Sequence, residues 1–292
     1  MEYLMTYGWS ILIVAVVLGA LAYLGGFNPL YFAPKANPGN CQVFRPNGAG
    51  TSYDINLLGV CNGEIPKYTA AYNGGSSIIS IPLPTDAVYN TVITAWIYSA
   101  GNNQCNCGQT IALLGSSGAS NGYGEYVGAG YISAGGCTTT QNLTALESIV
   151  RWVPCSKTII QRNKWYNVAL VSVPNDGNVI YEMYVDGVDV WVTGSLSLPI
   201  PPQQYMLIGN DNSGRVFDGQ IANVQLYNTS LDANSIMALY QEGIGGAPID
   251  LQNLVGWWPL NGNANDYSGN GNNGVPTNVV YTSSWISSYN PP

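Results

Sequence analysis

The sequence of 292 residues is poor in charge and contains no histidine. Charged residues make up 8 % of it, against about a quarter in an average globular protein. Without histidine, the commonest general base and metal ligand is missing, which excludes the usual serine and cysteine triads. The net charge of −8 and the lack of any run of lysine or arginine exclude a nucleic-acid partner, because phosphate backbones would be repelled.

Apolar and turn-forming residues are abundant instead. Hydrophobic residues make up 46 % of the chain, which excludes an intrinsically disordered protein. With 35 glycines and 17 prolines, turns should be frequent and long helices few. We expect a mainly β body, a two-sheet antiparallel jelly-roll sandwich. Segments rich in β-branched and aromatic residues are predicted as strands at 91–98, 165–173, 179–185, 188–192, 205–209 and 221–227.

Turn and cap residues separate these segments. Residues 174–178 are predicted as a hairpin turn, and Asp186 with Gly187 as a two-residue turn before the next strand. One short helix is expected, with Ser230 as its N-cap and Gly243 as its stop. The apolar face of this helix would consist of Ile236, Leu239 and Tyr240.

The first part of the chain differs, because residues 3–34 carry no charge at all. From Trp9 to Leu24 the sequence is apolar on every side of a helix, so this segment must be buried in lipid or in protein. A helix from Met1 to Leu24 would be roughly 36 Å long, enough to cross a bilayer. We therefore expect a hydrophobic helix over residues 1–27, a Pro/Gly linker over 28–40 and the jelly-roll domain over 41–292.

Three hypotheses compete for the leading segment. A cleaved secretory signal would need a basic start, but no lysine or arginine precedes Lys35. A plain membrane anchor fits the composition. In a lone anchor, however, Glu2 would have no partner, and an unpaired carboxylate in lipid is costly. We therefore expect a partner for Glu2.

The leading sequence MEYLMTYGWSILIVAVVLGALAYLGGFNP resembles the start of archaeal type IV pilin-like proteins, which are made with a class III signal peptide. The resemblance implies a filament subunit, inserted in the membrane before assembly, whose helices then pack in the filament core. It also implies that Glu2 meets the amino terminus of a neighbouring subunit. Family members carry a basic leader before this point, so we expect either a processed chain or a true start upstream.

A homopolymer of such helices would give each apolar segment an equally apolar surface, and small residues would allow close approach. The same small residues are equally typical of an ordinary membrane helix. The residues expected to contribute to filament assembly are Glu2, Tyr3, Leu4, Tyr7, Gly8, Trp9, Ile11, Leu12, Val16, Leu18, Gly19 and Tyr23.

The body of the chain resembles the laminin G-like or concanavalin A-like lectin and glucanase jelly rolls. The resemblance spans residues 68–275 and rests on VITAWIY, NKWYNVALVSV with YEMYVDGVDV, LIGNDNSGRVFDGQIANVQLYNTSLDANSIMALY and GWWPLNGNANDYSGNGNNG. The last stretch normally opens such a domain, whereas here it follows the predicted helix. We expect a circularly permuted jelly roll whose first strand comes from residues 253–260. The alternative is the start of a truncated second copy.

Candidate sites follow from this resemblance, which does not by itself give a function. Glu182 and Asp186 are the best local carboxylate pair for a glycan hydrolase, because with Tyr184 they share one face of a strand. The closely spaced Glu and Asp motif of the hydrolases is missing, so we expect no catalytic residue and no enzyme. Exposed Tyr or Trp side chains would support stacking on saccharides, although aromatics in sandwiches more often fill the core.

No cofactor is required, but a structural calcium ion is a further hypothesis, since lectin-like sandwiches often bind one through loop oxygens. The same residue types are above all turn formers. The loop residues that would supply these oxygens are Asp211, Asn212, Asp218, Asn265 and Asp266.

Cysteines and glycosylation sequons both indicate an extracellular location. The cysteines stand at Cys41, Cys61, Cys105, Cys107, Cys137 and Cys155, an even number that favours disulfides over a metal site. We expect Cys105 and Cys107 to pair with Cys137 and Cys155, which leaves Cys41 for Cys61. Two sequons begin at Asn142 and Asn228, and Asn142 is the preferred acceptor because it is expected in a loop.

The sequence thus predicts a structural subunit of an extracellular pilus-like filament. Its apolar helices would pack in the core, and its lectin-like domains would be displayed outside for adhesion to surface glycans. A membrane-anchored carbohydrate-binding protein is the main alternative, and a secreted glycan hydrolase is the other.

Overall fold

The computed structural model describes residues 66–87, 90–100, 109–115, 131–134, 143–148, 151–152, 160–176, 178–192, 196–197, 203–212, 215–285, 288–289 and 292, with Val14 and Val16. The chain divides into two compact units, Met1–Ala36 and Asn37–Pro292. Of the residues expected to build a filament core only Val16 is described, and it is helical and exposed. Apart from Val14 and Val16, the leading segment lies outside the described residues, as do the linker and the six cysteines. No described helix is long and apolar enough to cross a membrane.

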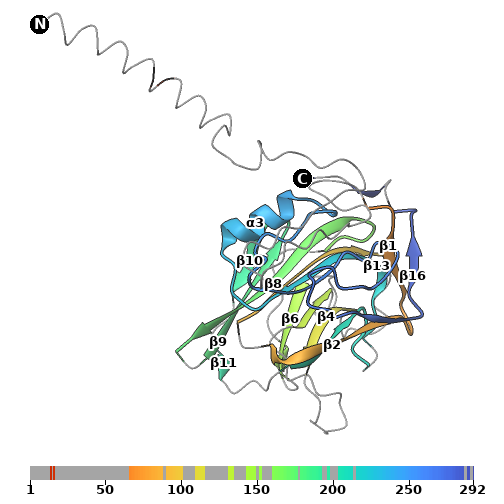
Figure 1. The fold of residues 1–292 in the computed structure, drawn as a ribbon, viewed down its shortest axis with the longest axis horizontal. Coiled ribbons are helices and arrows are strands. Elements are labelled where there is room, and N and C mark those ends of the chain that lie inside the picture. The colour runs from red at the N-terminus through yellow and green to blue at the C-terminus, as the bar shows by residue number, and fades with distance from the viewer. Residues whose placement is uncertain are drawn as a thin grey trace, which may run out of the picture. The chain divides into compact units, whose positions relative to one another are not determined.

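The second unit contains two antiparallel sheets (Figure 1). Within the described ranges, the larger sheet consists of β1 (Thr69–Asn73), β3 (Val92–Ser99), β8 (Trp165–Asn175), β9 (Asn178–Val185), β10 (Val188–Val192), β11 (Leu196–Ser197), β13 (Asp218–Tyr227), β14 (Leu254–Trp258) and β16 (Val280–Thr282). The smaller sheet consists of β2 (Ile78–Ala87), β4 (Gln109–Gly115), β5 (Tyr131–Ala134), β6 (Leu143–Ser148), β7 (Arg151–Trp152), β12 (Gln203–Ile208) and β15 (Val275–Thr277). The predicted mainly β, two-sheet antiparallel architecture is confirmed.

Strand order follows from the pairing. The larger sheet runs β10–β9–β8–β3–β13–β1–β16, with β11 beside β9 and β14 beside β13. The smaller sheet runs β15–β2–β12–β4–β5–β6–β7. Each of the six segments predicted as strands is a strand in the structure.

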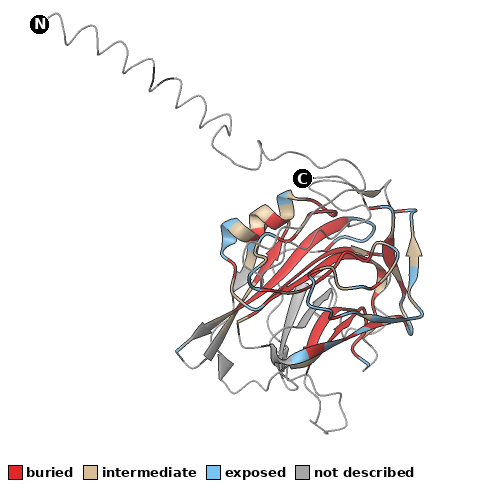
Figure 2. Cartoon of the chain, in the orientation of Figure 1, coloured by how far each residue is buried: buried red, intermediate tan, exposed pale blue. Residues whose placement is uncertain are grey.

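The main core lies between the two sheets, and a second layer covers the outer face of the larger one. On β3, Ile93, Ala95 and Ile97 face the inter-sheet core, whereas Val92 and Trp96 belong to clusters on the opposite face. Both faces of β3 are therefore buried, as the continuous red of the central strands shows (Figure 2). This explains why its sequence is apolar almost throughout rather than alternating.

The helix α3 (Ala233–Gln241) covers part of that outer face, where Ile236 and Leu239 are buried. Its N-cap is Asp232, whose side chain accepts a hydrogen bond of 2.8 Å from the backbone N–H of Ser235. The prediction of Ser230 as N-cap is wrong, because the helix begins two residues later and a carboxylate already satisfies its first turn. Gly243 ends the helix as predicted, with a φ of +80°.

Two turns test the hairpin predictions. Asp186 and Gly187 form the predicted two-residue turn, with φ values of 51° and 74°. The turn predicted over 174–178 is shorter, because β8 continues to Asn175 and β9 begins at Asn178. The predicted turn is too long because Asn175 and Asn178 pair with each other in the ladder between β8 and β9. This pairing outweighs the preference of Pro174 and of these asparagines for loops.

Residues 253–260 supply a strand of this sandwich, as expected. The strand β14 pairs with the second half of β13, on the side where β1 pairs with its first half. A register shift between Ala222 and Gln225 separates the halves, and there the N–H of Asn223 bonds the carbonyl of Pro259 at 3.1 Å. The stretch therefore completes the same sheet and does not start a second copy.

Candidate functional site

Three chain segments interlock at one end of the sandwich: the β1–β2 turn, the start of β4 and the loop 209–217 between β12 and β13. Backbone hydrogen bonds join Gly74 N–H to the Phe217 carbonyl at 3.0 Å and Thr110 N–H to the Arg215 carbonyl at 3.2 Å. The N–H of Asp218 donates to Oε1 of Gln109 at 3.1 Å. The described part of the loop next to β13, residues 215–217, is thus held by both neighbouring segments.

The loop leaves β12 at Gly209, where only glycine fits. Its φ is +83°, and a Cβ at this position would lie 2.1 Å from the ring of Tyr72. Tyr72 is buried and meets Phe217 edge to face, with ring centroids 6.2 Å apart. The buried ring of Tyr72 therefore determines the backbone conformation with which the loop begins at Gly209.

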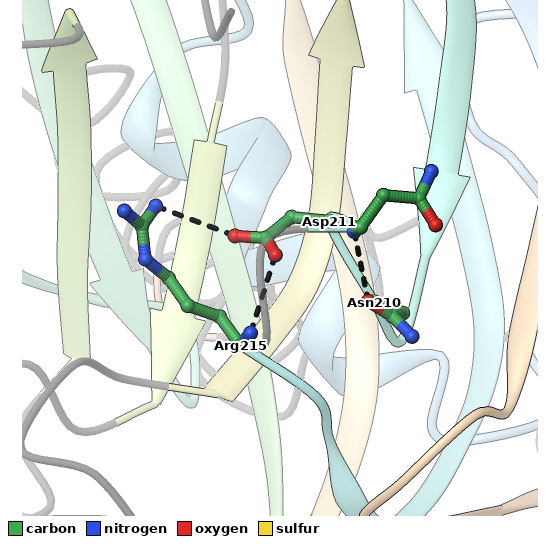
Figure 3. Close-up of polar contacts among 4 residues, drawn as sticks. Asn210, Asp211 and Arg215 are labelled. Carbon is green, nitrogen blue, oxygen red and sulfur yellow. Dashed lines mark hydrogen bonds and ion pairs between the residues drawn. The ribbon is translucent and has the colours of Figure 1, made fainter. Parts of the chain in front are cut away.

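An ion pair shapes the middle of the loop (Figure 3). The carboxylate of Asp211 accepts hydrogen bonds from the backbone N–H and from the guanidinium Nη1 of Arg215, both at 3.3 Å. The Asp211 side chain is fully buried, while that of Arg215 is 19 % exposed. The buried carboxylate thus anchors a cation that reaches the surface.

Next to this ion pair, the side chain of Asn210 holds a turn in which Asn212 is exposed to solvent. Oδ1 of Asn210 accepts the backbone N–H of Asn212 at 2.8 Å, and Asn210 itself is 7 % exposed. Asn212 is exposed and has a φ of 59°, a left-handed conformation that asparagine tolerates. Asn212 and Arg215 thus reach the surface from backbone positions that are themselves hydrogen-bonded.

The five predicted calcium ligands fall into two separate regions, and Asp218, which was expected in a loop, is the first residue of β13. Asp211, Asn212 and Asp218 belong to the end just described, whereas Asn265 and Asp266 follow β14. Throughout the described ranges, no three His, Cys, Asp or Glu side chains gather so as to hold a metal ion. The carboxylate of Asp211 is already engaged by Arg215. These residues do not fit one shared site, and calcium binding itself stays a prediction.

Asp266 is an organiser of its own loop. One oxygen accepts the N–H groups of Trp257 and Ser268 at 3.0 and 2.8 Å, and the other accepts that of Asn272 at 2.9 Å. Backbone donors thus occupy three of the about four lone-pair positions of this carboxylate. Within the GWWPLNGNANDYSGNGNNG stretch, Asp266 therefore serves to hold a turn.

The candidate hydrolase carboxylates are engaged in structural contacts. Glu182 accepts a hydrogen bond of 2.8 Å from the Tyr184 hydroxyl, so these two side chains share a face as predicted. Asp186, predicted on the same strand face, lies instead in the turn that follows β9. Tyr184 is buried in the cluster that α3 covers. Asp186 accepts the backbone N–H of Asn167 at 2.9 Å. Burial raises the pKa of the Asp186 carboxyl, against the lowering effects of this hydrogen bond and of Lys164.

Aromatic side chains mostly fill the interior. The tryptophans whose side chains are described are all buried: Trp96, Trp165, Trp257, Trp258 and Trp285. Tyr240 stacks on Trp96 with ring centroids 5.8 Å apart, and Tyr289 meets the same ring edge to face at 5.4 Å. Stacking of a saccharide on an exposed tryptophan therefore finds no support among the described side chains.

Sequence reasoning missed Gln109 and Arg215. A signal existed for Arg215, which stands four residues after Asp211 in a loop rich in Asn and Gly. Gln109 gave none, because its partner lies 109 positions away along the chain. The sequon residue Asn142 lies outside the described residues, whereas Asn228 is described and exposed.

Comparison with known proteins places this fold. A family model, the concanavalin A-like lectin/glucanases superfamily, matches residues 73–237. No curated protein matches the chain. A Bacteroides ovatus ATCC 8483 protein whose proposed role is carbohydrate binding is similar in structure, with a TM-score of 0.53 and 15 % identity over 75 % of this chain. The match covers 61 % of the Bacteroides protein, so this chain spans less than two thirds of its length.

A second similar structure is the heptameric SAP-like pentraxin from Limulus polyphemus. Its TM-score is 0.52, with 13 % identity over 74 % of this chain and 94 % of that chain. At such identities, both likenesses show the fold alone. The family model, in contrast, covers more than half of the sequence. The chain therefore belongs to the concanavalin A-like lectin/glucanases superfamily.

Proposed function

We propose that this domain binds carbohydrate through the loop 209–217. The observation that carries the proposal is the pairing of a fully buried Asp211 with a partly exposed Arg215, beside an exposed Asn212. Saccharides are recognised by hydrogen bonds to hydroxyl groups, and planar guanidinium and amide groups can bond two hydroxyls at once. Family membership and the Bacteroides likeness support the same ligand class.

Hydrogen bonds that already hold the loop support binding, because less conformational entropy is then lost when a ligand binds. In the loop, Arg215 is tied to β4 by Thr110 and Phe217 is tied to the β1–β2 turn by Gly74. Gln109 of β4 holds Asp218, the first residue of β13. Because this backbone is already held in the free protein, ligand binding does not have to order it again. Asn212 and Arg215 are therefore the residues that we assign to direct ligand contact.

The charge of the chain favours neutral saccharides over acidic ones. The net charge is −8, and the described cation of this loop, Arg215, is neutralised by Asp211. A polyanionic glycan would meet repulsion from the protein as a whole. We therefore expect neutral hexose-based glycans as ligands.

The test is a glycan array probed with the full chain in detergent, followed by titration of the best ligand. Asn212→Gly removes the amide while keeping the left-handed backbone, and should weaken binding about tenfold if one good hydrogen bond is lost. Asn234→Ala, an exposed asparagine on α3, is the matched control and should leave binding unchanged. Binding of no glycan, or equal affinity in both variants, would contradict the proposal.

We further propose that the leading segment places this domain outside the cell, either as a filament subunit or as an anchored monomer. The position of Glu2 before an uncharged apolar run favours the filament. Glu2→Ala should then abolish filaments seen by negative-stain microscopy, while the domain still binds glycan. If Glu2→Ala has no effect and the protein remains with lipid as monomers, the anchored form is correct.

Catalysis is not part of the proposal. Glu182 and Asp186 are bonded to Tyr184 and Asn167, and the cluster around Tyr184 lies under α3. Incubation of the full chain with a polysaccharide panel should release no reducing sugar. Release that disappears in Glu182→Gln would restore the hydrolase hypothesis.

A further inference from the structure

The bend between β13 and α3 carries one of the two sequons, Asn228-Thr229-Ser230. The residues on either side of the bend, Tyr227 and Leu231, are buried in the cluster under α3. The backbone N–H of Asn228 donates to the carbonyl of Asn253 at 2.8 Å. The sequon is thus held in place by its backbone and by its buried neighbours.

The side chain of Asn228, in contrast, is exposed and makes no hydrogen bond within the described structure. Many asparagines of this domain use their amides to hold turns. Asn73 accepts three backbone N–H groups, Asn270 and Asn272 donate to the carbonyl of Val255, and Asn223 donates to that of Gly246. Asn228 is therefore available for a role that the fold does not need.

Asn228 can be compared with the other exposed asparagines of the described structure. Besides Asn228, the described residues include four exposed asparagines whose side chains make no hydrogen bond: Asn163, Asn212, Asn234 and Asn265. The residues two positions after them are Trp165, Gly214, Ile236 and Tyr267. Of these five exposed amides, the one at Asn228 is followed by the serine that an N-glycosylation acceptor requires.

We propose that Asn228 is an N-glycan attachment site. In this reaction Nδ2 of Asn228 forms a bond to the anomeric carbon of a lipid-linked oligosaccharide. The bond from that carbon to the lipid phosphate breaks, the phosphate leaves with the electron pair, and the amide loses a proton to a base of the transferase. No oxidant or reductant is consumed. The product is a glycan projecting from the bend that precedes α3.

Trypsin separates the two sequons of this chain, which makes the test direct. No lysine or arginine follows Arg215, so Asn228 lies in the tryptic peptide 216–292, while Asn142 lies in the peptide 68–151. The full chain is isolated from the cells that make it, and both peptides are analysed by mass spectrometry. We expect the 216–292 peptide to carry a glycan, with fragment ions that place it on Asn228.

Variants expressed in the same cells identify the acceptor. Asn228→Gln and Ser230→Ala should each remove the glycan from the 216–292 peptide, whereas Ser230→Thr should retain it. Asn234→Gln, which changes an exposed asparagine outside a sequon, should leave the glycan in place. An unmodified 216–292 peptide in the wild-type chain, or a glycan that persists in Ser230→Ala, would overturn the proposal.

Discussion

Arg215 holds the buried carboxylate of Asp211 with two groups at once, its backbone N–H and its guanidinium Nη1, each 3.3 Å from a carboxylate oxygen. The residues stand four positions apart in one loop, and the carbonyl of Arg215 also accepts the N–H of Thr110. The pair links Asp211, whose side chain is buried in the sandwich, to Arg215, whose side chain reaches the surface. The shape of the candidate site therefore depends on it.

Arg215→Ala is expected to lower the free energy of unfolding by about 2 kcal/mol, because it leaves a buried carboxylate without its ionic partner. Chemical denaturation of the full chain, followed by tryptophan fluorescence, measures this change. The double variant Asp211→Asn with Arg215→Gln removes both charges and should recover part of the loss. An unchanged midpoint in Arg215→Ala would show that the ion pair does not stabilise the loop.

Gly209→Ala should destabilise the domain by about 2 kcal/mol or more, because the added Cβ meets the Tyr72 ring in addition to the strain of a positive φ. Gly271→Ala is the matched control. Gly271 has nearly the same φ, +80°, but nothing lies within 4 Å of its added Cβ. Its cost should be the backbone strain alone, about 1 kcal/mol. Equal costs in thermal melts would argue against the contact with Tyr72.

Glu242→Gln should stabilise the domain near neutral pH. Burial raises the pKa of the Glu242 carboxyl above its ordinary value of 4.5, so the folded state binds its proton more readily than the unfolded state. Wild-type stability therefore falls as pH rises through the folded pKa. The carboxylate also lies at the C-terminal end of α3, where the helix dipole disfavours it by about 0.5 kcal/mol.

The gain in Glu242→Gln should disappear as the pH falls below the ordinary pKa of 4.5, where both states of the wild type are protonated. Unfolding free energies of the two proteins between acid and neutral pH measure this. A difference that stays constant with pH would mean that the effect comes from packing and not from ionisation.

Asp232→Ala should lower the melting temperature, because the first turn of α3 loses the carboxylate that accepts the Ser235 N–H. The hydrogen bonds from Ser235 lower the pKa of the Asp232 carboxyl. The stabilisation is therefore present at neutral pH and is lost as the pH falls through the folded pKa. Ser230→Ala should have a smaller effect. The reverse order would place the cap at Ser230.

The sandwich could be predicted because its strands have local signals. Val92 to Ser99 consists almost wholly of β-branched, aromatic and small residues, and Asp186-Gly187 is a typical hairpin turn. The sequence predicts the start of α3 wrongly because Ser230 and Asp232 are both good N-cap residues. Which of them caps the helix depends on how Leu231 and Ile236 pack in the core.

The candidate site was predicted only in part. Asp211 and Asn212 of the loop 209–217 are predicted from the sequence, but as calcium ligands, because sequence does not show that Arg215 occupies the Asp211 carboxylate. Asp266 looked like a ligand for the same reason, although three backbone N–H groups occupy its oxygens. The contact of Gln109 with Asp218 requires the two sheets to be in place and has no local signal.

Photo-crosslinking tests the proposed carbohydrate site most directly. A neutral glycan that binds on the array is fitted with a diazirine and crosslinked to the full chain, and the modified peptides are mapped by mass spectrometry. The account predicts crosslinks within residues 209–217 that the unlabelled glycan competes away. Competable crosslinks confined to α3, or crosslinking that the unlabelled glycan does not reduce, would contradict it.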